Sequence, residues 1–350
     1  MDTFEHRRLM LRSGLDLAAL RGVEFGPLCS PTVSRAEGNI LYVDHATADE
    51  LRKKYHGDAN VDLAAICDVD IVCDDGVLTG KLPDRSVDYV IASHVAEHIP
   101  DLATWLIDIE AMLKPTGELR LVLPDKRFSF DYLRRVSSPA ELLDCYLHKL
   151  RRPRILQILD CALGVAHVDA RQAYARTLTD TEVVRVHTYD SAMVIARDAQ
   201  ATGKYVDVHC WVFTPESFAQ CMEALVGAGL VKLACSRFVD TGYDVWEFFV
   251  FLQPCDDRQK ALESWQEMRR NASDQKTREM RRNTKDQEAI ARLQEELSQL
   301  RAAIAGSFLI RAGNAVPRPV RTVLRRIARG SWWLISGQLL AGLRGRGPRS

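Results

Sequence analysis

The sequence of 350 residues lacks several features that would place it in a special class of protein. No apolar run approaches the roughly 20 residues that span a bilayer, and the charged segment Met1 to Gly14 has no apolar core for a secretory signal. Its nine cysteines are scattered, odd in number and without CxxC spacing, which disfavours a disulfide framework or a structural zinc site. We therefore expect an intracellular, cytoplasmic protein.

The chain also lacks net charge, because acidic and basic residues balance at 47 each, but the balance is uneven. From Ser307 to the end there are nine arginines and no acidic residue, so this segment carries +9 and residues 1–306 carry −9. Apolar residues and the paired Trp332 and Trp333 accompany these arginines, which is typical of a helix at a lipid interface. We predict that residues 307–350 bind an anionic membrane at its inner face rather than nucleic acid. Docking on the acidic body is an alternative.

The most informative stretch runs from Ser86 to Arg127. Residues 89–92 form a short apolar run, typical of a strand buried in a parallel sheet. The spacing of apolar residues then predicts a helix over 101–113, and residues 119–123 form the next predicted strand. Between the first strand and the helix lie four polar residues: Ser93, His94, Glu97 and His98. The pattern is βαβ, with chemistry expected at the carboxyl end of its first strand.

Two further strands predicted from apolar runs end in acidic residues. Residues 39–43 are followed by Asp44, and residues 70–73 by Asp74. Asp44 lies about 18 residues after Gly26, the interval at which nucleotide-binding α/β folds place an acid on the ribose hydroxyls. A solvated or capping acid is the alternative for each.

These motifs resemble the class I S-adenosylmethionine-dependent methyltransferases, in their type 11 branch. The branch pattern ending in V-x-E-H is matched by Asp88, Val90, Val95, Glu97 and His98, and its L-K-P-G-G by residues 113–117, with Thr116 in place of the first glycine. The resemblance covers about residues 22–254. It implies an α/β fold: a Rossmann-like, doubly wound, mostly parallel seven-stranded sheet with an antiparallel last strand.

The resemblance also assigns roles to individual residues. It implies S-adenosylmethionine as cofactor, contacted by Glu24, Gly26, Asp44, Asp74, Ser93 and His94. The first motif, E-x-G-x-G, keeps Glu24 and Gly26 but has Leu28 where the second glycine is expected. His94 is the first candidate for a catalytic base, whereas a structural role is favoured for His98. Asp125, Arg127 and Arg134 are candidates for binding a polar or anionic substrate.

The run Pro124-Asp125-Lys126-Arg127 resembles members of polysaccharide pathways. We therefore expect methylation of a hydroxyl on a glycan or lipid-linked saccharide, a reaction in which alignment of donor and acceptor supplies much of the acceleration. A catalytically silent scaffold is the alternative, because Leu28 weakens the first motif. A dinucleotide oxidoreductase is disfavoured, because G-x-G-x-x-G is not present.

The chain is expected to divide into three parts. Residues 1–255 form the methyltransferase domain, in which a helical insertion at 128–205 selects the acceptor. Residues 256–305 are helical, with a short heptad seam at 290–304 that favours a homodimer through a coiled coil. A helix packed on the body is the alternative. Residues 306–350 form the basic amphipathic tail. The insertion carries a basic cluster at 149–154, interpreted as a solvated face with a phosphate contact as the alternative. No metal site is predicted, because His187 and His209 have no third ligand at matching spacing.

Overall fold

The structure, a computed structural model, describes residues 3–73, 77, 78 and 80–272. Its strands are β1 Arg21–Phe25, β2 Asn39–Asp44, β3 Ile71–Val72, β4 Val87–Ser93, β5 Leu113–Pro124, β6 Ala166–His167, β7 Val184–Arg185, β8 Leu233–Val239 and β9 Glu247–Pro254. Its α-helices are α1 Thr3–Arg12, α2 Ala48–Lys54, α3 Leu102–Met112, α4 Pro139–Leu147, α5 Ile155–Gly164, α6 Ala170–Ala175, α7 Tyr189–Thr202 and α8 Pro215–Gly227. Asp74, the coiled-coil segment 290–304 and the tail 307–350 lie outside the described residues.

The main sheet has seven strands in the order β3-β2-β1-β4-β5-β9-β8. Strands β1 to β5 run parallel, and β9 runs antiparallel to both β5 and β8. This is the predicted mostly parallel, doubly wound sheet, so the fold class is confirmed. The strand order reverses between β1 and β4, and open α/β sheets bind ligands at such a switch point.

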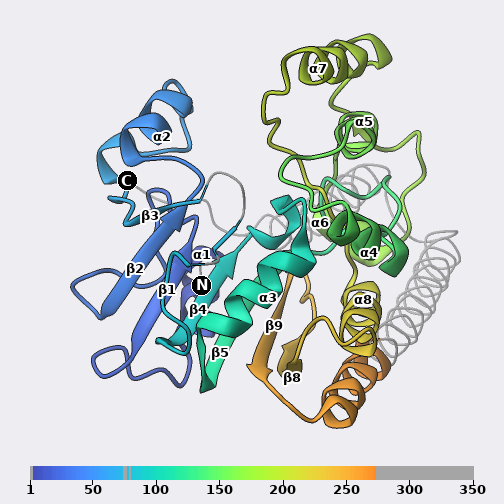
Figure 1. Cartoon of the computed structure of the whole chain (residues 1–350). Helices are drawn as coiled ribbons and strands as arrows, with labels where there is room; N and C mark the ends of the chain where they lie inside the picture. Colours follow the sequence, from blue (N-terminus) through green and yellow to red (C-terminus); the bar gives the residue numbers. More distant parts are fainter. Residues whose placement is uncertain (1–2, 74–76, 79, 273–350) are drawn as a thin grey trace, which may run out of the picture. The chain divides into compact units, whose positions relative to one another are not determined.

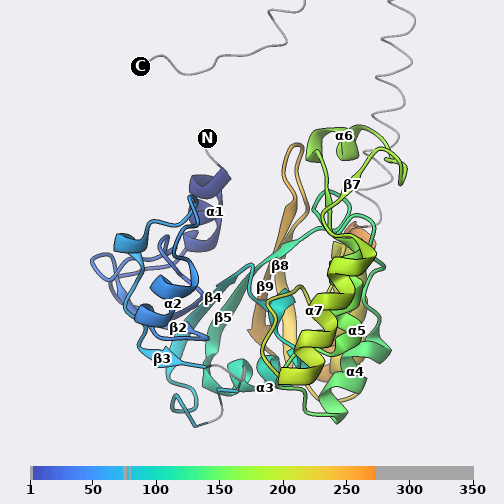
Figure 2. The same ribbon diagram turned by 90° about the horizontal axis from the view of Figure 1, so that it is seen from above.

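Alternate residues of β4 explain why both faces of the sheet are covered. Val90 and Ala92 belong to a large core formed with α3, α4, α5 and α8, whereas Tyr89 and Ile91 pack on the other face with Leu11 of α1. Successive strand side chains point to opposite faces, so the side chains of an apolar run such as residues 89–92 are buried on both faces of the sheet. In Figure 2 the sheet is seen with α1 on one side and α3 and α4 on the other.

The N-terminal helix α1 is short. It ends at Arg12, and Gly14 follows with φ +75°, a left-handed conformation that glycine adopts without strain. The buried Arg120 of β5 donates hydrogen bonds to the carbonyl oxygens of Leu11 (2.7 Å) and Ser13 (2.9 Å). The sheet therefore caps this helix end, which is a contact the local sequence does not reveal.

The structure also extends the strand after α3. Helix α3 begins at Asp101, whose side chain accepts from the Thr104 amide, and it buries Leu102, Trp105, Leu106 and Ile109. β5 then starts at Leu113 rather than near residue 119, because Leu113 pairs with Val87 across an irregularity in register. Residues 114–118, which lie between the predicted helix and the predicted strand, thus belong to the first part of β5.

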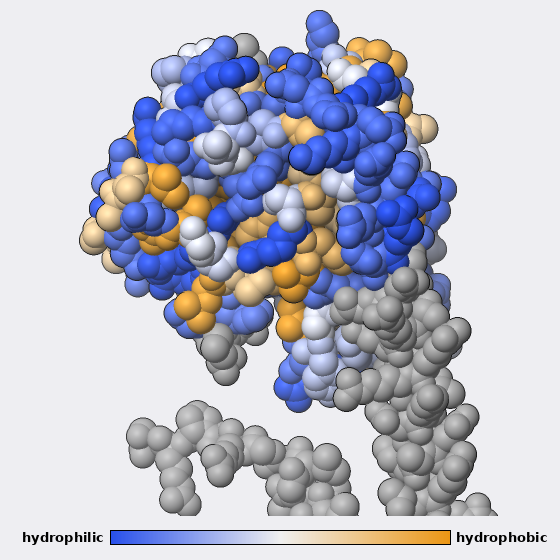
Figure 3. Space-filling view, turned by 90° about the horizontal axis from the view of Figure 1, so that it is seen from below, coloured by the Kyte–Doolittle hydropathy of each residue, from blue (hydrophilic) through white to orange (hydrophobic). Residues whose placement is uncertain are grey.

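The helical insertion follows β5 and forms the upper right part of Figure 1. It contains α4, α5, α6 and α7 and the short β6–β7 pair. Buried residues of α4, α5 and α7 join the large core. Figure 3, seen from the side opposite α7, shows a mainly hydrophilic surface with hydrophobic side chains gathered toward its middle and left.

Residues 258–272 form a further helix that packs on the sheet. Ala261 and Trp265 are fully buried, and the Trp265 indole donates to the Leu233 carbonyl at 2.8 Å. The predicted boundary after residue 255 thus falls ahead of this packed helix. The chain divides into two compact units, Met1–Glu279 and Met280–Ser350. Within the residues described, no helix is long and apolar enough to cross a membrane.

Candidate active site

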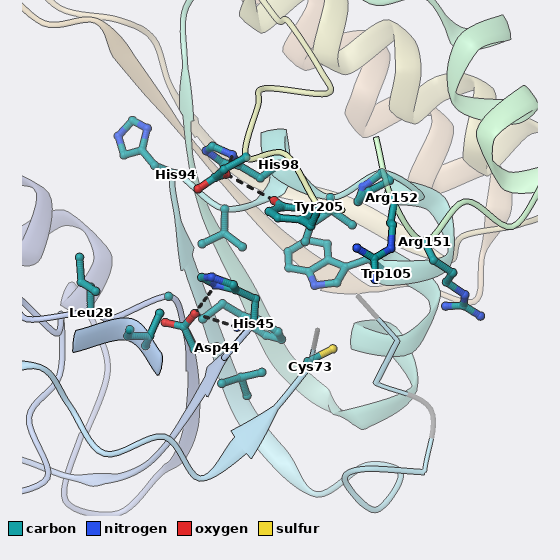
Figure 4. Close-up of a pocket in the computed structure, with 18 of the residues that line it drawn as sticks. Leu28, Asp44, His45, Cys73, His94, His98, Trp105, Arg151, Arg152 and Tyr205 are labelled. Atoms are coloured by element: carbon teal, nitrogen blue, oxygen red, sulfur yellow. Dashed lines mark hydrogen bonds and ion pairs between the residues drawn. The ribbon is translucent and has the colours of Figure 1, made fainter. Parts of the chain in front are cut away.

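A pocket of about 430 Å³ opens at the carboxyl ends of β1, β2 and β4. Its wall includes Gly26 after β1, Asp44 at the end of β2 and His94 after β4, which places it at the topological switch point. In Figure 4, Leu28 lies at one end of the pocket and Arg151 and Arg152 lie at the other. The volume falls within the range of about 300–1,000 Å³ that ligand pockets occupy.

The loop after β1 brings the main chain to the pocket wall. Gly26 has φ +60°, its amide donates to the Val43 carbonyl at 2.9 Å, and an added Cβ would lie 3.1 Å from Val95 Cγ2. Leu28, which stands where the resembled motif has glycine, is also left-handed, with φ +45°, and it lines the pocket. A leucine in this conformation is strained. Position 28 therefore has the backbone conformation that glycine favours, although the residue there is leucine.

Glu24 holds this loop from inside. Its buried carboxylate accepts from the amides of Thr32 (2.6 Å) and Val33 (3.1 Å). Burial raises the pKa of Glu24, and the two amide hydrogen bonds oppose that rise. Glu24 is not among the residues that line the pocket, and in this structure it holds the loop after β1.

Asp44 reaches the pocket directly from the end of β2. Its Oδ1 atom accepts from the His45 amide at 2.7 Å and lies 2.6 Å from His45 Nδ1 (Figure 4). Both contacts use one oxygen and leave Oδ2 for a ligand. A carboxylate in this position can accept hydrogen bonds from ribose hydroxyls.

His94 lines the pocket but is held by two acidic side chains. Its Nε2 lies 2.7 Å from Glu247 Oε2, and its Nδ1 lies 3.3 Å from Glu97 Oε1. Burial disfavours the charged ring, but contact with Glu247 and Glu97 outweighs it and raises the pKa of His94. Glu247 is fixed in turn by Arg7 of α1. Both ring nitrogens of His94 thus face carboxylates in this structure, and its role as base stays a prediction.

The opposite wall comes from the segment after the insertion. Asp207 lies 2.9 Å from His98 Nδ1 and 3.0 Å from Lys54 Nζ, and Tyr205 lies beside it on the pocket. Burial would raise the pKa of Asp207, but His98 and Lys54 outweigh burial and hold it well below its usual range. His98 therefore both lines the pocket and ties the β4 turn to this segment.

Arg151 and Arg152 supply positive charge to the same pocket. Both are exposed and lie between α4 and α5 of the insertion. In the part of the chain that the structure describes, neither forms an ion pair, in contrast to the neighbouring Arg154. They are thus free to meet an anionic group of a ligand.

The predicted substrate residues Asp125 and Arg127 do not line the pocket. Asp125 is fully buried, accepts from Arg127 Nε at 2.9 Å and from Thr241 Oγ1 at 2.7 Å, and follows β5 directly. Arg127 also pairs with Asp240 at 3.1 Å. These side chains bind one another and connect β5 to the segment after β8. In this structure their contacts are therefore with other residues of the chain.

Arg134 also contacts other residues of the chain. Its guanidinium is 1% exposed and pairs with Asp131 at 2.7 Å and Asp160 at 2.8 Å. It also donates to the His209 carbonyl at 2.9 Å. These contacts hold Arg134 against Asp131, Asp160 and His209 in this structure, and its role in substrate binding stays a prediction. Ser93, the last residue of β4, likewise lies outside the pocket wall.

The structure adds pocket residues that sequence reasoning missed. Tyr205 and Asp207 gave no signal, because they lie more than 100 residues from the motifs they face. Arg151 and Arg152 were visible as part of a basic cluster, and only the fold shows which two of its members reach the pocket. Trp105 is buried in the core and also lines the pocket.

Comparison with known proteins agrees with this geometry. Residues 22–121 match the family model described as a methyltransferase domain. The match begins in β1 and ends in β5, so it contains the Gly26 loop, Asp44 and the β4 turn. A search of curated proteins finds no match.

Solved structures resemble this fold only at low similarity. The mitomycin 7-O-methyltransferase MmcR is 14% identical over 72% of this chain and 54% of its own, with a TM-score of 0.34. An S-adenosylmethionine-dependent methyltransferase from Mesorhizobium loti is 14% identical over 71% and 99%, with a TM-score of 0.37. A putative zinc-dependent alcohol dehydrogenase from Rhodobacter sphaeroides is 10% identical over 71% and 89%, with a TM-score of 0.41.

The chain spans about half of the length of the mitomycin enzyme. At these TM-scores the neighbours carry no argument about activity, and the assignment depends on the family match. That match covers the strands and loops that form the pocket. Residues 22–121 are therefore similar to a methyltransferase domain, and they belong to a mostly parallel seven-stranded sheet.

Proposed function

We propose that this chain transfers a methyl group from S-adenosylmethionine to a hydroxyl of a glycan or lipid-linked saccharide. The observation that carries the proposal is the convergence of Gly26, Asp44 and His94 on one pocket at the switch point. The backbone at Gly26 lets a ligand approach closely, and Asp44 offers a carboxylate oxygen to the ribose. The matched methyltransferase domain includes all three residues.

Methyl transfer from a sulfonium is an in-line displacement in which the cofactor carries its own leaving group. The acceptor hydroxyl must lose its proton, but positioning of the two reactants can supply a large part of the acceleration. His94 lines the pocket, and Glu247 and Glu97 hold its ring in place. Its role in this proposal is therefore orientation.

Arg151 and Arg152 support an acceptor that carries negative charge. They line the pocket beside the insertion and remain unpaired among the described residues. Guanidinium groups bind phosphate and carboxylate through paired hydrogen bonds. A saccharide with a phosphate or an acidic sugar fits this end of the pocket.

The experiment measures transfer of a labelled methyl group by the full chain to acidic oligosaccharides, sugar phosphates and their neutral counterparts. We expect transfer to an anionic acceptor. The double variant Arg151→Ala/Arg152→Ala should raise the acceptor KM and leave the KM for S-adenosylmethionine nearly unchanged. Arg197→Ala, at an exposed position on α7, is the matched control. An acceptor KM that is equal in the double variant and the wild type would refute the role of the two arginines.

A catalytically silent scaffold is the second candidate, and one observation favours it. The Leu28 side chain lines the pocket at the position where the resembled motif has glycine. A side chain there takes space that a bound cofactor needs. If the full chain neither transfers a methyl group nor binds S-adenosylmethionine, the scaffold is the better account.

A further inference from the structure

A second group of polar side chains lies beside the pocket: Glu97, His98 and His209. One possible ligand atom from each lies within 4.8 Å of the others. Glu97 and His98 belong to the short turn η2, Ala96–His98, after β4, whereas His209 lies more than 100 residues further along the chain. Spacing along the sequence therefore could not indicate this group. Two histidines and one carboxylate are a ligand set that catalytic zinc sites use.

Glu97 is the member that most needs a partner. It is 0% exposed, and neither carboxylate oxygen has a hydrogen bond to any residue that the structure describes. His94 Nδ1 approaches Oε1 to 3.3 Å without hydrogen-bond alignment, and His209 Nε2 lies 3.9 Å away. Leaving a buried carboxylate without hydrogen bonds is costly. A cation bound between these groups would remove that cost.

Both histidines are already oriented as metal ligands usually are. Asp131 Oδ2 lies 2.6 Å from His209 Nδ1, and Asp131 is itself paired with the buried Arg134. Asp207 Oδ1 lies 2.9 Å from His98 Nδ1, close enough for an ion pair but without hydrogen-bond alignment. A carboxylate on one ring nitrogen fixes the tautomer and orientation of a ligating histidine. In each ring this arrangement leaves Nε2 for a metal ion.

We propose that Glu97, His98 and His209 bind a divalent transition-metal ion, with Zn²⁺ as the ion best suited to this set of nitrogen and oxygen donors. Metal–ligand bonds of about 2.0–2.2 Å place neighbouring donors about 3.4 Å apart in a tetrahedral site. The three donors must therefore move together by small side-chain rotations when the ion binds.

The site has three protein ligands and faces the pocket through His98. A tetrahedral ion would keep one position for water or for a ligand in the pocket, as in catalytic zinc sites. Its role rests on the proposed function: an ion here would bind the acceptor hydroxyl and lower the pKa of that hydroxyl.

The test is calorimetric titration of Zn²⁺ into the chelator-stripped full chain in the absence of S-adenosylmethionine. We expect one ion per chain with micromolar or tighter affinity. His98→Asn and His209→Asn should weaken binding by more than about 100-fold, and Asp131→Asn, which removes the carboxylate beside His209 Nδ1, by about 10- to 100-fold. His148→Asn, at an exposed histidine on the surface, should bind as the wild type does.

Thermal unfolding provides a second measurement, because His209 is buried and its variant can lose stability for other reasons. Zn²⁺ should raise the Tm of the wild type and of His148→Asn, and should not raise the Tm of His98→Asn. A wild type that binds no Zn²⁺, or a His98→Asn variant that binds it normally, overturns the proposal. Because no methyl donor is present, either result is independent of whether the chain is a methyltransferase.

Discussion

Two acidic residues at the ends of neighbouring strands illustrate how contacts decide roles at the scale of single residues. Both carboxylate oxygens of Glu24 accept hydrogen bonds from the amides of Thr32 and Val33. Asp44 contacts His45 through Oδ1 only. Asp44 also lines the pocket and Glu24 does not. We therefore assign ligand binding to Asp44 and loop shaping to Glu24.

Replacing Asp44 by alanine should weaken the binding of S-adenosylhomocysteine by about 1–3 kcal/mol, since hydrogen bonds to charged groups are worth about that much. This corresponds to about 5- to 150-fold in Kd. Asp49→Ala is the matched control, because Asp49 belongs to the adjacent α2 but its side chain is 83% exposed. Titration calorimetry of both variants checks the prediction. Equal affinities for the two variants would remove Asp44 from the cofactor site.

At the scale of elements, the insertion contains a buried ion pair near its start. Arg134 and Asp131 have side chains 1% and 2% exposed and lie 2.7 Å apart. Removing one partner of such a pair leaves an uncompensated buried charge, which costs about 3–5 kcal/mol. Arg134 also pairs with Asp160 of α5, so this contact joins the start of the insertion to the helix that follows Arg151 and Arg152.

Arg134→Ala should therefore lower the free energy of unfolding by about 3–5 kcal/mol. Arg135→Ala is the matched control, because its side chain is exposed. Chemical denaturation of the two variants measures the difference. If Arg134→Ala is as stable as the control and only acceptor turnover falls, the original prediction of substrate binding by Arg134 is the better one.

A second element-scale contact holds the end of α1 against the loop after β1. Glu37 accepts from the Ser34 amide at 3.0 Å and pairs with Arg12 at 2.7 Å. Hydrogen bonds from Ser34 and the nearby Arg12 lower the pKa of Glu37 from its model-compound value of 4.5 to about 2. A carboxyl with a lowered folded-state pKa stabilises the protein above the unfolded-state pKa, and that contribution is lost as pH falls through the folded-state pKa.

Glu37→Gln should consequently unfold at a lower temperature than the wild type at neutral pH. The difference in Tm should shrink as the pH falls from about 4.5 toward about 2, because the wild-type carboxyl becomes protonated over that range. Thermal unfolding at several pH values measures it, with Glu267→Gln, at an exposed position, as control. A Tm difference that stays constant with pH would show that the Glu37 carboxylate contributes no stability through its charge.

What the sequence predicts well is local or depends on short spacing. The β4 turn and α3 follow from an apolar run and a capping aspartate, and Asp44 follows from its distance to Gly26. Side-chain direction is not local: Asp125 and Arg134 lie near the expected sheet edge but turn into the body. Contacts between residues more than 100 positions apart, such as that of His98 with Asp207, cannot be predicted from the local sequence around either residue.

At the scale of the whole molecule, charge divides the chain. The +9 segment from Ser307 onward contrasts with −9 over residues 1–306. We propose that this tail binds an anionic membrane surface, and the proposal rests on the sequence, since residues 307–350 lie outside the described part of the chain. Each arginine near such a surface is worth about 1 kcal/mol.

Arg325→Gln/Arg326→Gln/Arg329→Gln in the full chain should therefore weaken binding to anionic vesicles by about 3 kcal/mol, or about 150-fold. Vesicle flotation measures this, with neutral vesicles as control. Equal flotation of the wild type and the triple variant would contradict the anchor. It would favour docking of the tail on the acidic body.

The central claim is that the pocket formed by Gly26, Asp44 and His94 binds S-adenosylmethionine. Titration calorimetry of the full-length wild type with S-adenosylmethionine, S-adenosylhomocysteine and NAD tests it most directly. We predict one site per chain with micromolar affinity for the first two ligands and no measurable binding of NAD. Absence of binding to both methyl-cycle ligands, or preferential binding of NAD, would contradict the account.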